Sequence, residues 1–221
     1  MSKSARQHMI EAQIVRRGIR DRNILAAMGE VPREDFVGPD FGEYAYEDRA
    51  LPIAEGQTIS QPYIVAAMLN AARVSRADRV LEVGAGSGYS AAVLSRLVAE
   101  VFAIERHAGL TEAAKERCRT LGYHNIRFRT GDGTKGWPEA APFDAILVAA
   151  AAPDPPESLK QQLAPGGRLI IPIGENPEQR LIRLTRLDKR NFQRDDLGGV
   201  NFVPLIGAEG WSETGPGRHT P

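Results

Sequence analysis

The fold of this chain is decided by residues 79–90, which read Arg79-Val80-Leu81-Glu82-Val83-Gly84-Ala85-Gly86-Ser87-Gly88-Tyr89-Ser90. An apolar, β-branched run leads into three glycines, and apolar residues at helical spacing follow over residues 91–98. This order predicts a strand, a glycine loop and a helix. Since glycine lets the backbone approach a ligand closely, and a helix start offers unpaired N–H groups, the loop predicts a binding site for a nucleotide-like cofactor.

The spacing of the glycines indicates which cofactor this is. A dinucleotide fingerprint has its third glycine three residues after the second, and Tyr89 stands at that position here. Glu82 precedes the first glycine by two residues, where its carboxylate can meet a cationic group; S-adenosylmethionine carries an ammonium and no pyrophosphate. The motif therefore resembles the first motif of the Rossmann-like methyltransferases. A glycine-rich turn without a ligand is the alternative.

Two acids further along the chain extend this cofactor site. Glu105 ends a second predicted strand, where an acid accepts hydrogen bonds from ribose hydroxyls in Rossmann-like folds. Asp132 follows a third strand and can reach the exocyclic amine of an adenine, although a plain Asp-Gly turn would look the same. The predicted cofactor-binding residues are Glu82, Gly84, Ala85, Gly86, Ser87, Gly88, Glu105, Arg106, Asp132 and Gly133.

Strand and helix patterns alternate from residue 80 to residue 174, which predicts an α/β, doubly wound and mostly parallel sheet. Two further strands are predicted at 180–188 and 200–206, with little room for a helix between them, so the sheet should have an antiparallel edge. A helical extension precedes the sheet, broken at Gly18 and Asp21. We expect one domain: residues 1–75 with helices and a substrate loop over 37–62, residues 76–207 as the cofactor-binding core, and 208–221 as a mobile tail.

Composition excludes several classes of protein. The 221 residues carry no net formal charge, which argues against a broad surface for nucleic acid or anionic membrane and favours a small substrate or a peptide. Cys118 is the one cysteine, so no intrachain disulfide can form, and the four histidines are dispersed without metal-ligand spacing. The N-terminus lacks the apolar core of a signal peptide, and the longest apolar run is too short to span a bilayer. We expect a cytoplasmic monomer without a metal.

Several motifs together resemble the protein-L-isoaspartate O-methyltransferase family, from about residue 9 to Trp211. They stand at residues 31–37, 56–62, 80–89, 131–137, 142–146 and 202–205, and the segment 56–62 is the most specific. The resemblance implies transfer of a methyl group from S-adenosylmethionine to the α-carboxylate of L-isoaspartyl residues in damaged proteins and peptides, which starts their repair through a succinimide.

The resemblance also implies roles for individual residues. It makes Ser60 the active-site serine, places Thr58 and Ile59 beside the peptide, and makes Val203 and Pro204 part of the opposite wall. Asn201 departs from the pattern, because the family commonly has arginine before Phe202. The run 149–152 also lacks a threonine that is often found there.

The chemistry agrees with this assignment, because a carboxylic acid has a pKa of about 4 and is already an anionic nucleophile at neutral pH. No general base is needed, and Ser60 would orient the carboxylate. Capping of the helix that starts near Pro62 is an equally good reading of Ser60 from spacing alone. The rival functions are a dinucleotide oxidoreductase, a methyltransferase for another small molecule, and a non-catalytic cofactor-binding module.

Overall fold

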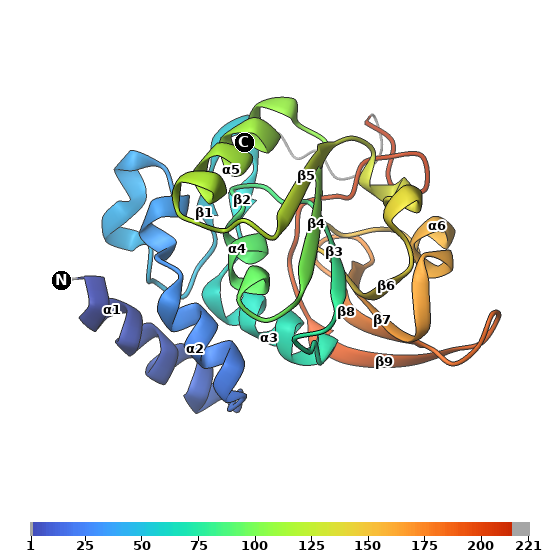
Figure 1. Cartoon of the computed structure of the whole chain (residues 1–221), viewed down its shortest axis with the longest axis horizontal. Coiled ribbons are helices and arrows are strands. Elements are labelled where there is room, and N and C mark those ends of the chain that lie inside the picture. The colour runs from blue at the N-terminus through green and yellow to red at the C-terminus, as the bar shows by residue number, and fades with distance from the viewer. Residues whose placement is uncertain (1, 214–221) are drawn as a thin grey trace.

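The computed structural model describes residues 2–213 and contains one seven-stranded sheet, one two-stranded sheet and helices packed around them (Figure 1). The α-helices are α1 (Ser2–Met9), α2 (Arg22–Glu30), α3 (Pro62–Ala72), α4 (Tyr89–Ser95), α5 (Ala108–Thr120) and α6 (Glu157–Gln161). The strands are β1 (Leu51–Pro52), β2 (Thr58–Ile59), β3 (Arg79–Val83), β4 (Glu100–Glu105), β5 (Ile126–Thr130), β6 (Phe143–Val148), β7 (Leu163–Ile173), β8 (Arg180–Arg186) and β9 (Phe192–Gly199).

The large sheet has the strand order β5-β4-β3-β6-β7-β8-β9. The first five strands in this order pair in parallel, and β8 and β9 add an antiparallel edge. The chain leaves β3 toward β4 on one side and returns to β6 on the other, so the glycine loop lies where the strand order reverses. Ligands bind at this place in open α/β sheets. The predicted doubly wound fold with an antiparallel edge is confirmed.

Alternate residues of the central strands face two different cores. Val80 of β3 packs in a core with α2, α3, α4 and α5, while Leu81 and Val83 face the core that α6 and Trp137 cover. Strands buried on both faces read as continuous apolar runs, which is why the sequence pattern marks them so clearly. Figure 1 shows α3, α4 and α5 on one side of the sheet and α6 on the other.

The N-terminal extension breaks where the sequence predicts. Helix α1 continues through a π turn (Ile10–Ile14) and a 3-10 turn (Val15–Arg17), and Gly18 ends it in the left-handed conformation with φ of 97°. The carboxylate of Asp21 accepts hydrogen bonds from the backbone N–H groups of Asn23 and Ile24, which caps the start of α2.

Two predictions about irregular segments are wrong. The expected loop over residues 37–62 contains the hairpin of β1 and β2, in which Leu51 pairs with Ile59. The last strand is β9, at Phe192–Gly199, and residues 200–206 make two isolated bridges, Pro204 with Ala151 and Ile206 with Trp211. Strand β9 is an edge strand with mostly exposed polar side chains, so it lacks the apolar pattern by which buried strands are found.

The described part of the tail is attached to the core. The backbone N–H of Ala208 donates to the Asp132 carboxylate, Glu209 accepts from the Ser158 hydroxyl, and Trp211 Nε1 donates to the carbonyl of Ala151 at 3.0 Å. The expectation of a mobile tail therefore fails for residues 208–213, and its remainder, 214–221, lies outside the described residues.

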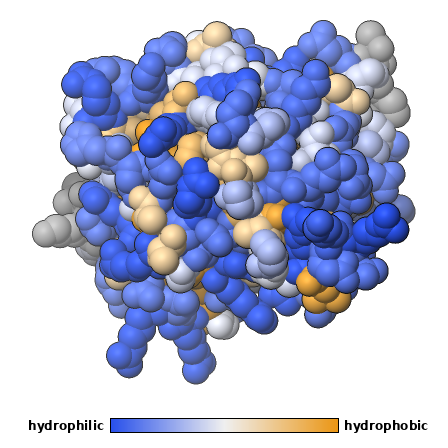
Figure 2. Space-filling model, turned by 45° about the vertical axis from the view of Figure 1, so that its right-hand side comes forward, coloured by the Kyte–Doolittle hydropathy of each residue, from blue (hydrophilic) through white to orange (hydrophobic). Residues whose placement is uncertain are grey.

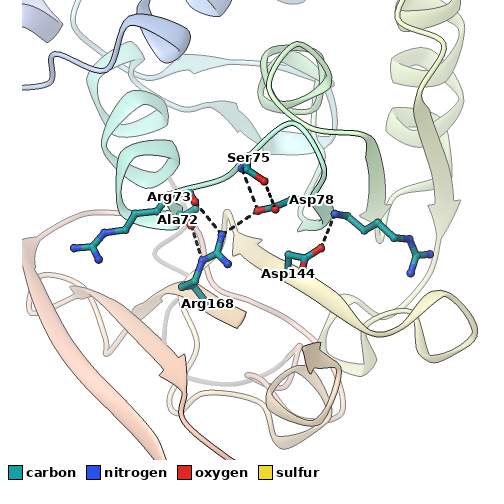
Figure 3. A network of polar contacts seen from close by, with 7 residues as sticks. Ala72, Arg73, Ser75, Asp78, Asp144 and Arg168 are labelled. Carbon is teal, nitrogen blue, oxygen red and sulfur yellow. Dashed lines mark hydrogen bonds and ion pairs between the residues drawn. The ribbon is translucent and has the colours of Figure 1, made fainter. Parts of the chain in front are cut away.

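A polar network joins the sheet to α3 at the end opposite the glycine loop (Figure 3). Arg168 of β7 donates to the carbonyls of Ala72 and Arg73 at 2.7 and 3.1 Å, and lies 3.1 Å from the Asp78 carboxylate. These contacts satisfy carbonyl groups at the C-terminus of α3, where the helix itself supplies no donor. Asp78 also accepts from Ser75, so the turn between α3 and β3 is held at both ends.

The surface in Figure 2 is mostly hydrophilic, with small and separate apolar areas. Within residues 2–213, no helix has both the length and the apolar character needed to cross a bilayer.

Candidate active site

A cavity of about 450 Å³ opens at the carboxyl end of β3. Three segments form its walls: the glycine loop after β3, the β2 strand with the start of α3, and the extended segment after β9. They come from distant parts of the chain. Of the predicted site residues, those that line the cavity are Thr58, Ile59, Ser60, Glu82, Gly84, Ala85, Gly86, Ser87, Glu105, Arg106, Gly133, Val203 and Pro204.

The glycine loop owes its shape to left-handed backbone conformations and to close packing. Gly84, Gly86 and Gly88 have φ angles of 86°, 52° and 86°, which favour glycine over any residue with a Cβ. A Cβ on Gly88 would lie 3.1 Å from the Cβ of Ala114 and 3.3 Å from Cys118 Sγ. Gly88 therefore packs against α5 and does not line the cavity, unlike the other two glycines.

Glu105 fixes the glycine loop from the neighbouring strand. Its Oε2 accepts a hydrogen bond from the Gly86 backbone N–H, and its Oε1 accepts one from the His107 N–H, each at 3.0 Å. The side chain is buried at the cavity wall. A carboxylate held by two N–H donors is rigid and still has lone pairs for further donors, so it can accept from the hydroxyls of a ligand.

Glu82 is the least satisfied ionisable group of the cavity. Its side chain is buried, and its Oε2 atom has no hydrogen-bond partner among residues 2–213. Burial raises its pKa to about 8; repulsion from Glu105 acts in the same direction, and a hydrogen bond with Ser90 acts against both. A buried carboxylate without a partner favours binding of a cationic group beside it.

Ser60 lies between β2 and α3 and lines the cavity from that side. Gln61 occupies the N-cap position of α3, and no side chain caps this helix. The structure thus gives Ser60 no capping role, and its hydroxyl makes no hydrogen bond within residues 2–213 that would occupy it. Thr58 and Ile59 are fixed by pairing with β1.

The cavity wall opposite Ser60 is the extended segment around Val203, which is not part of a regular strand. The carbonyl of Val203 accepts from the Ala151 N–H at 2.8 Å, and the Leu205 N–H donates to the Ala151 carbonyl at 2.7 Å. Gln179 holds the same segment from β8's side: its Oε1 accepts from the Phe202 N–H at 2.7 Å and its Nε2 donates to the Phe202 carbonyl at 3.0 Å. Gln179 is buried, and no motif in the sequence indicates this role.

Asp132 does not line the cavity, contrary to what its predicted contact with a ligand requires. One oxygen accepts from the N–H and hydroxyl of Thr134, and the other accepts from the Ala208 N–H. Burial alone would raise the pKa of Asp132, but these hydrogen bonds lower it below its usual value. Asp132 therefore forms a plain Asp-Gly turn, the alternative to a ligand contact, and Gly133 lines the cavity.

Sequence reasoning missed several lining residues because their neighbours in space are far away in the chain. Arg17 comes from the N-terminal extension, Tyr63 and Met68 from α3, and Tyr89 and Ser90 from the start of α4. Tyr63, Tyr89 and Ser90 belong to or adjoin the motifs at 56–62 and 80–89, whereas Arg17 and Met68 do not. Within the described residues, no group of three or more His, Cys, Asp or Glu side chains is arranged to hold a metal ion.

The donor set fits S-adenosylmethionine. Glu82 offers a carboxyl group with an unpaired oxygen for an ammonium, and Glu105 offers acceptor sites for ribose hydroxyls. In the loop at 84–87, two of the four residues are glycines, so the backbone itself lines the cavity. Arg106 also lines the cavity, and its guanidinium lies 2.6 Å from the Glu213 carboxylate. Two buried carboxylates disfavour a pyrophosphate, because like charges repel.

Comparison with known proteins gives a consistent result. The family model described as Protein-L-isoaspartate(D-aspartate) O-methyltransferase matches residues 4–210. The chain is 57% identical over 206 residues to a protein-L-isoaspartate O-methyltransferase of Methylorubrum populi, covering 93% of this chain and 97% of that protein. It is 52% identical over 210 residues to one of Brucella anthropi, covering 95% and 96%.

Solved structures agree with the sequence matches. A protein-L-isoaspartate O-methyltransferase structure has a TM-score of 0.83 at 31% identity and covers 95% of this chain and 67% of its own. A structure from Plasmodium falciparum, described as an enzyme of the same kind and solved with S-adenosyl-L-homocysteine, has a TM-score of 0.78 at 29% identity and covers 93% and 98%.

Proposed function

Because this chain belongs to the protein-L-isoaspartate(D-aspartate) O-methyltransferase family, we propose that it transfers a methyl group from S-adenosylmethionine to the α-carboxylate of L-isoaspartyl residues in peptides and damaged proteins. One observation carries this proposal. A single cavity joins the unpaired Glu82 carboxylate and the glycine loop on one side to the free Ser60 hydroxyl on the other.

The reaction requires no general acid or base from the protein. When bound, S-adenosylmethionine supplies a methyl group activated by the positive charge of its sulfonium. The substrate carboxylate is ionised at neutral pH, since its pKa is about 4. The chain therefore has to align the carboxylate and exclude water, and positioning alone can lower a barrier by roughly 7 to 11 kcal/mol.

The cofactor half of the cavity is assigned from the contacts of its residues. Glu82 would hold the ammonium, Glu105 the ribose hydroxyls, and the loop at 84–87 the part of the cofactor that approaches the backbone. Arg106 and Gly133 complete this half. Asp132 acts indirectly, because its hydrogen bonds to Thr134 and Ala208 shape the turn that presents Gly133.

The substrate half consists of Thr58, Ile59 and Ser60 on one wall and of Val203 and Pro204 on the other. Ser60 would donate a hydrogen bond to the α-carboxylate and so orient it. The fixed backbone of β2 and of the 203–204 segment would hold the peptide on either side. Methylation converts the carboxylate into a better leaving group, so the next backbone nitrogen can displace methanol and form a succinimide.

The test compares an isoaspartyl peptide with its aspartyl twin in the presence of radiolabelled S-adenosylmethionine. The free carboxylate of the isoaspartyl residue is its α-carboxylate, one bond from the backbone, whereas the free carboxylate of aspartate is on the side chain, one methylene further out. A displacement of about 1 Å can cost on the order of a hundredfold in rate. We expect methyl ester on the isoaspartyl peptide and almost none on the other; equal labelling of both, or labelling of nucleic acid, would contradict the proposal.

Replacement of Ser60 by alanine separates its proposed role from a structural one. Ser60→Ala should lower the methylation rate far more than the affinity for S-adenosylmethionine, because its proposed partner is the substrate. The melting temperature should stay near that of the unchanged protein. A parallel loss of stability and rate would speak for a structural role.

We further propose that the protein acts as a monomer in the cytoplasm, on polypeptides and not on nucleic acid or membranes. The absence of net charge supports a polypeptide substrate, since nucleic-acid binding draws on positive charge. The single cysteine supports a reducing compartment. Sedimentation of the purified protein and fractionation of its source cells would test both statements.

A further inference from the structure

The ionisable side chains that line the cavity are unevenly distributed. They comprise two carboxylates, Glu82 and Glu105, and two guanidinium groups, Arg106 and Arg17. Arg106 follows Glu105 directly in the chain and is paired with Glu213. At the cofactor side, a peptide carboxylate entering this cavity would meet the buried Glu105 carboxylate, and the repulsion between them opposes its binding there.

Arg17 lines the cavity beside Tyr63 of α3. Its Cζ atom is 3.3 Å from the centre of the Tyr63 ring, and Tyr63 is the third residue after Ser60. Its Nη1 lies 3.1 Å from the Asp48 carboxylate, while Gln61 Nε2 donates to the Asp48 carbonyl at 3.0 Å. These contacts tie Arg17 to both residues that flank Pro62 and fix the plane of its guanidinium.

The fixed guanidinium retains donors for a ligand. The ion pair with Asp48 engages Nη1, and no hydrogen bond within residues 2–213 engages Nε or Nη2. The side chain is 42% exposed, so it stands at the mouth of the cavity and not in its interior. A planar guanidinium that is already ordered binds a carboxylate through two parallel hydrogen bonds at a small further entropic cost.

We propose that Arg17 binds a carboxylate of the peptide substrate at the mouth of the cavity, either the α-carboxylate that is methylated or an acidic side chain beside it. This inference rests on the proposed function and names a specificity-determining residue for it. Arg17 offsets the repulsion of Glu105 and brings the anionic peptide toward Ser60. The neutral ester that forms at the α-carboxylate binds Arg17 less well, which favours its release.

The test uses Arg17→Ala together with Arg16→Ala as the matched control, since Arg16 is exposed and does not line the cavity. Each variant is assayed with two isoaspartyl peptides that carry C-terminal amides, one with neutral neighbours and one with a glutamate beside the isoaspartyl residue. We expect Arg17→Ala to raise KM about tenfold with at least one peptide. Its affinity for S-adenosylmethionine, measured by calorimetry, should be unchanged.

The pattern of loss identifies the bound carboxylate. An increase in KM with both peptides assigns the methylated carboxylate, and an increase confined to the glutamate peptide assigns the neighbour. Arg17→Lys should restore only part of the affinity, because a lysine lacks the planar pair of donors. The same order should appear when binding of a fluorescent peptide is followed by anisotropy.

Asp48→Asn distinguishes binding from a purely structural role of the ion pair. It removes the charge that competes for Arg17, so peptide affinity should stay the same or increase. If Asp48→Asn reproduces the loss seen in Arg17→Ala, or if Arg17→Ala behaves like Arg16→Ala, the inference is overturned while the proposed function stands. An unchanged protein that methylates neither peptide overturns the proposed function and this inference with it.

Discussion

At the scale of single residues, the buried Glu82 carboxylate predicts how stability depends on pH. Its pKa of about 8 in the folded protein lies above the ordinary value of 4.5. Folding therefore favours the protonated form, and the stability that this contributes is complete below pH 4.5 and is lost as the pH rises through 8. The free energy of unfolding of the cofactor-free protein should fall across this range.

Glu82→Gln should remove this pH dependence, because the amide stays neutral. At about 1.4 kcal/mol for each pKa unit, the variant should gain about 4 kcal/mol relative to the unchanged protein between pH 5 and pH 9. Urea denaturation at both pH values measures the difference. Parallel pH profiles for the two proteins would show that Glu82 is ionised in the fold without cost.

At the scale of elements, the extended wall segment depends on Gln179. The side chain of Gln179 satisfies both backbone groups of Phe202, and a buried backbone group left without a partner costs roughly 1 to 3 kcal/mol. Gln179→Ala should therefore loosen the wall around Val203 and raise KM for the peptide by about tenfold, with little effect on cofactor affinity.

Gln193→Ala is the matched control for this prediction. Gln193 lies exposed on β9 and its amide contacts only Asp195, so its removal should change neither constant. Steady-state kinetics with varied peptide, and calorimetry with S-adenosylmethionine, give the two readouts. Equal weakening of peptide and cofactor would mean that Gln179 supports the whole cavity.

The elements also show what a sequence can predict. Strands such as β3 and β6 are buried on both faces, so the sequence predicts them from continuous runs of apolar residues. The glycine loop is also predictable, because all residues of its motif are consecutive in the chain. Strand β9 could not be predicted from the sequence, because it is an exposed edge strand without an apolar pattern. The roles of Arg17 and Gln179 could not be predicted either, because their partners, Tyr63 and Phe202, lie 46 and 23 residues away in the chain.

At the scale of the whole molecule, Arg168 joins the sheet to the C-terminus of α3, at the end opposite the glycine loop (Figure 3). Its side chain and that of Asp78 are only 18% and 14% exposed. Removing Arg168 leaves Asp78 without its cationic partner and two carbonyls at the end of α3 without this donor, so Arg168→Ala should lower the free energy of unfolding by about 3 kcal/mol.

Arg190→Ala is the control for Arg168→Ala, since Arg190 lies exposed in the turn between β8 and β9. Urea titration at neutral pH compares the two variants, and the control should match the unchanged protein. If both variants lose the same free energy, the network in Figure 3 does not contribute to stability beyond an ordinary surface arginine.

The contact between Gly88 and α5 supplies a built-in reporter of motion. Cys118 Sγ lies 3.9 Å from the Gly88 carbonyl and is buried, and burial raises the pKa of the thiol to about 12. A maleimide can react with Cys118 only when α5 separates from the glycine loop, because reaction needs an accessible thiolate. The labelling rate therefore measures how often α5 separates from Gly88. S-adenosylmethionine should slow the labelling, because it would hold the glycine loop in place from the cavity side.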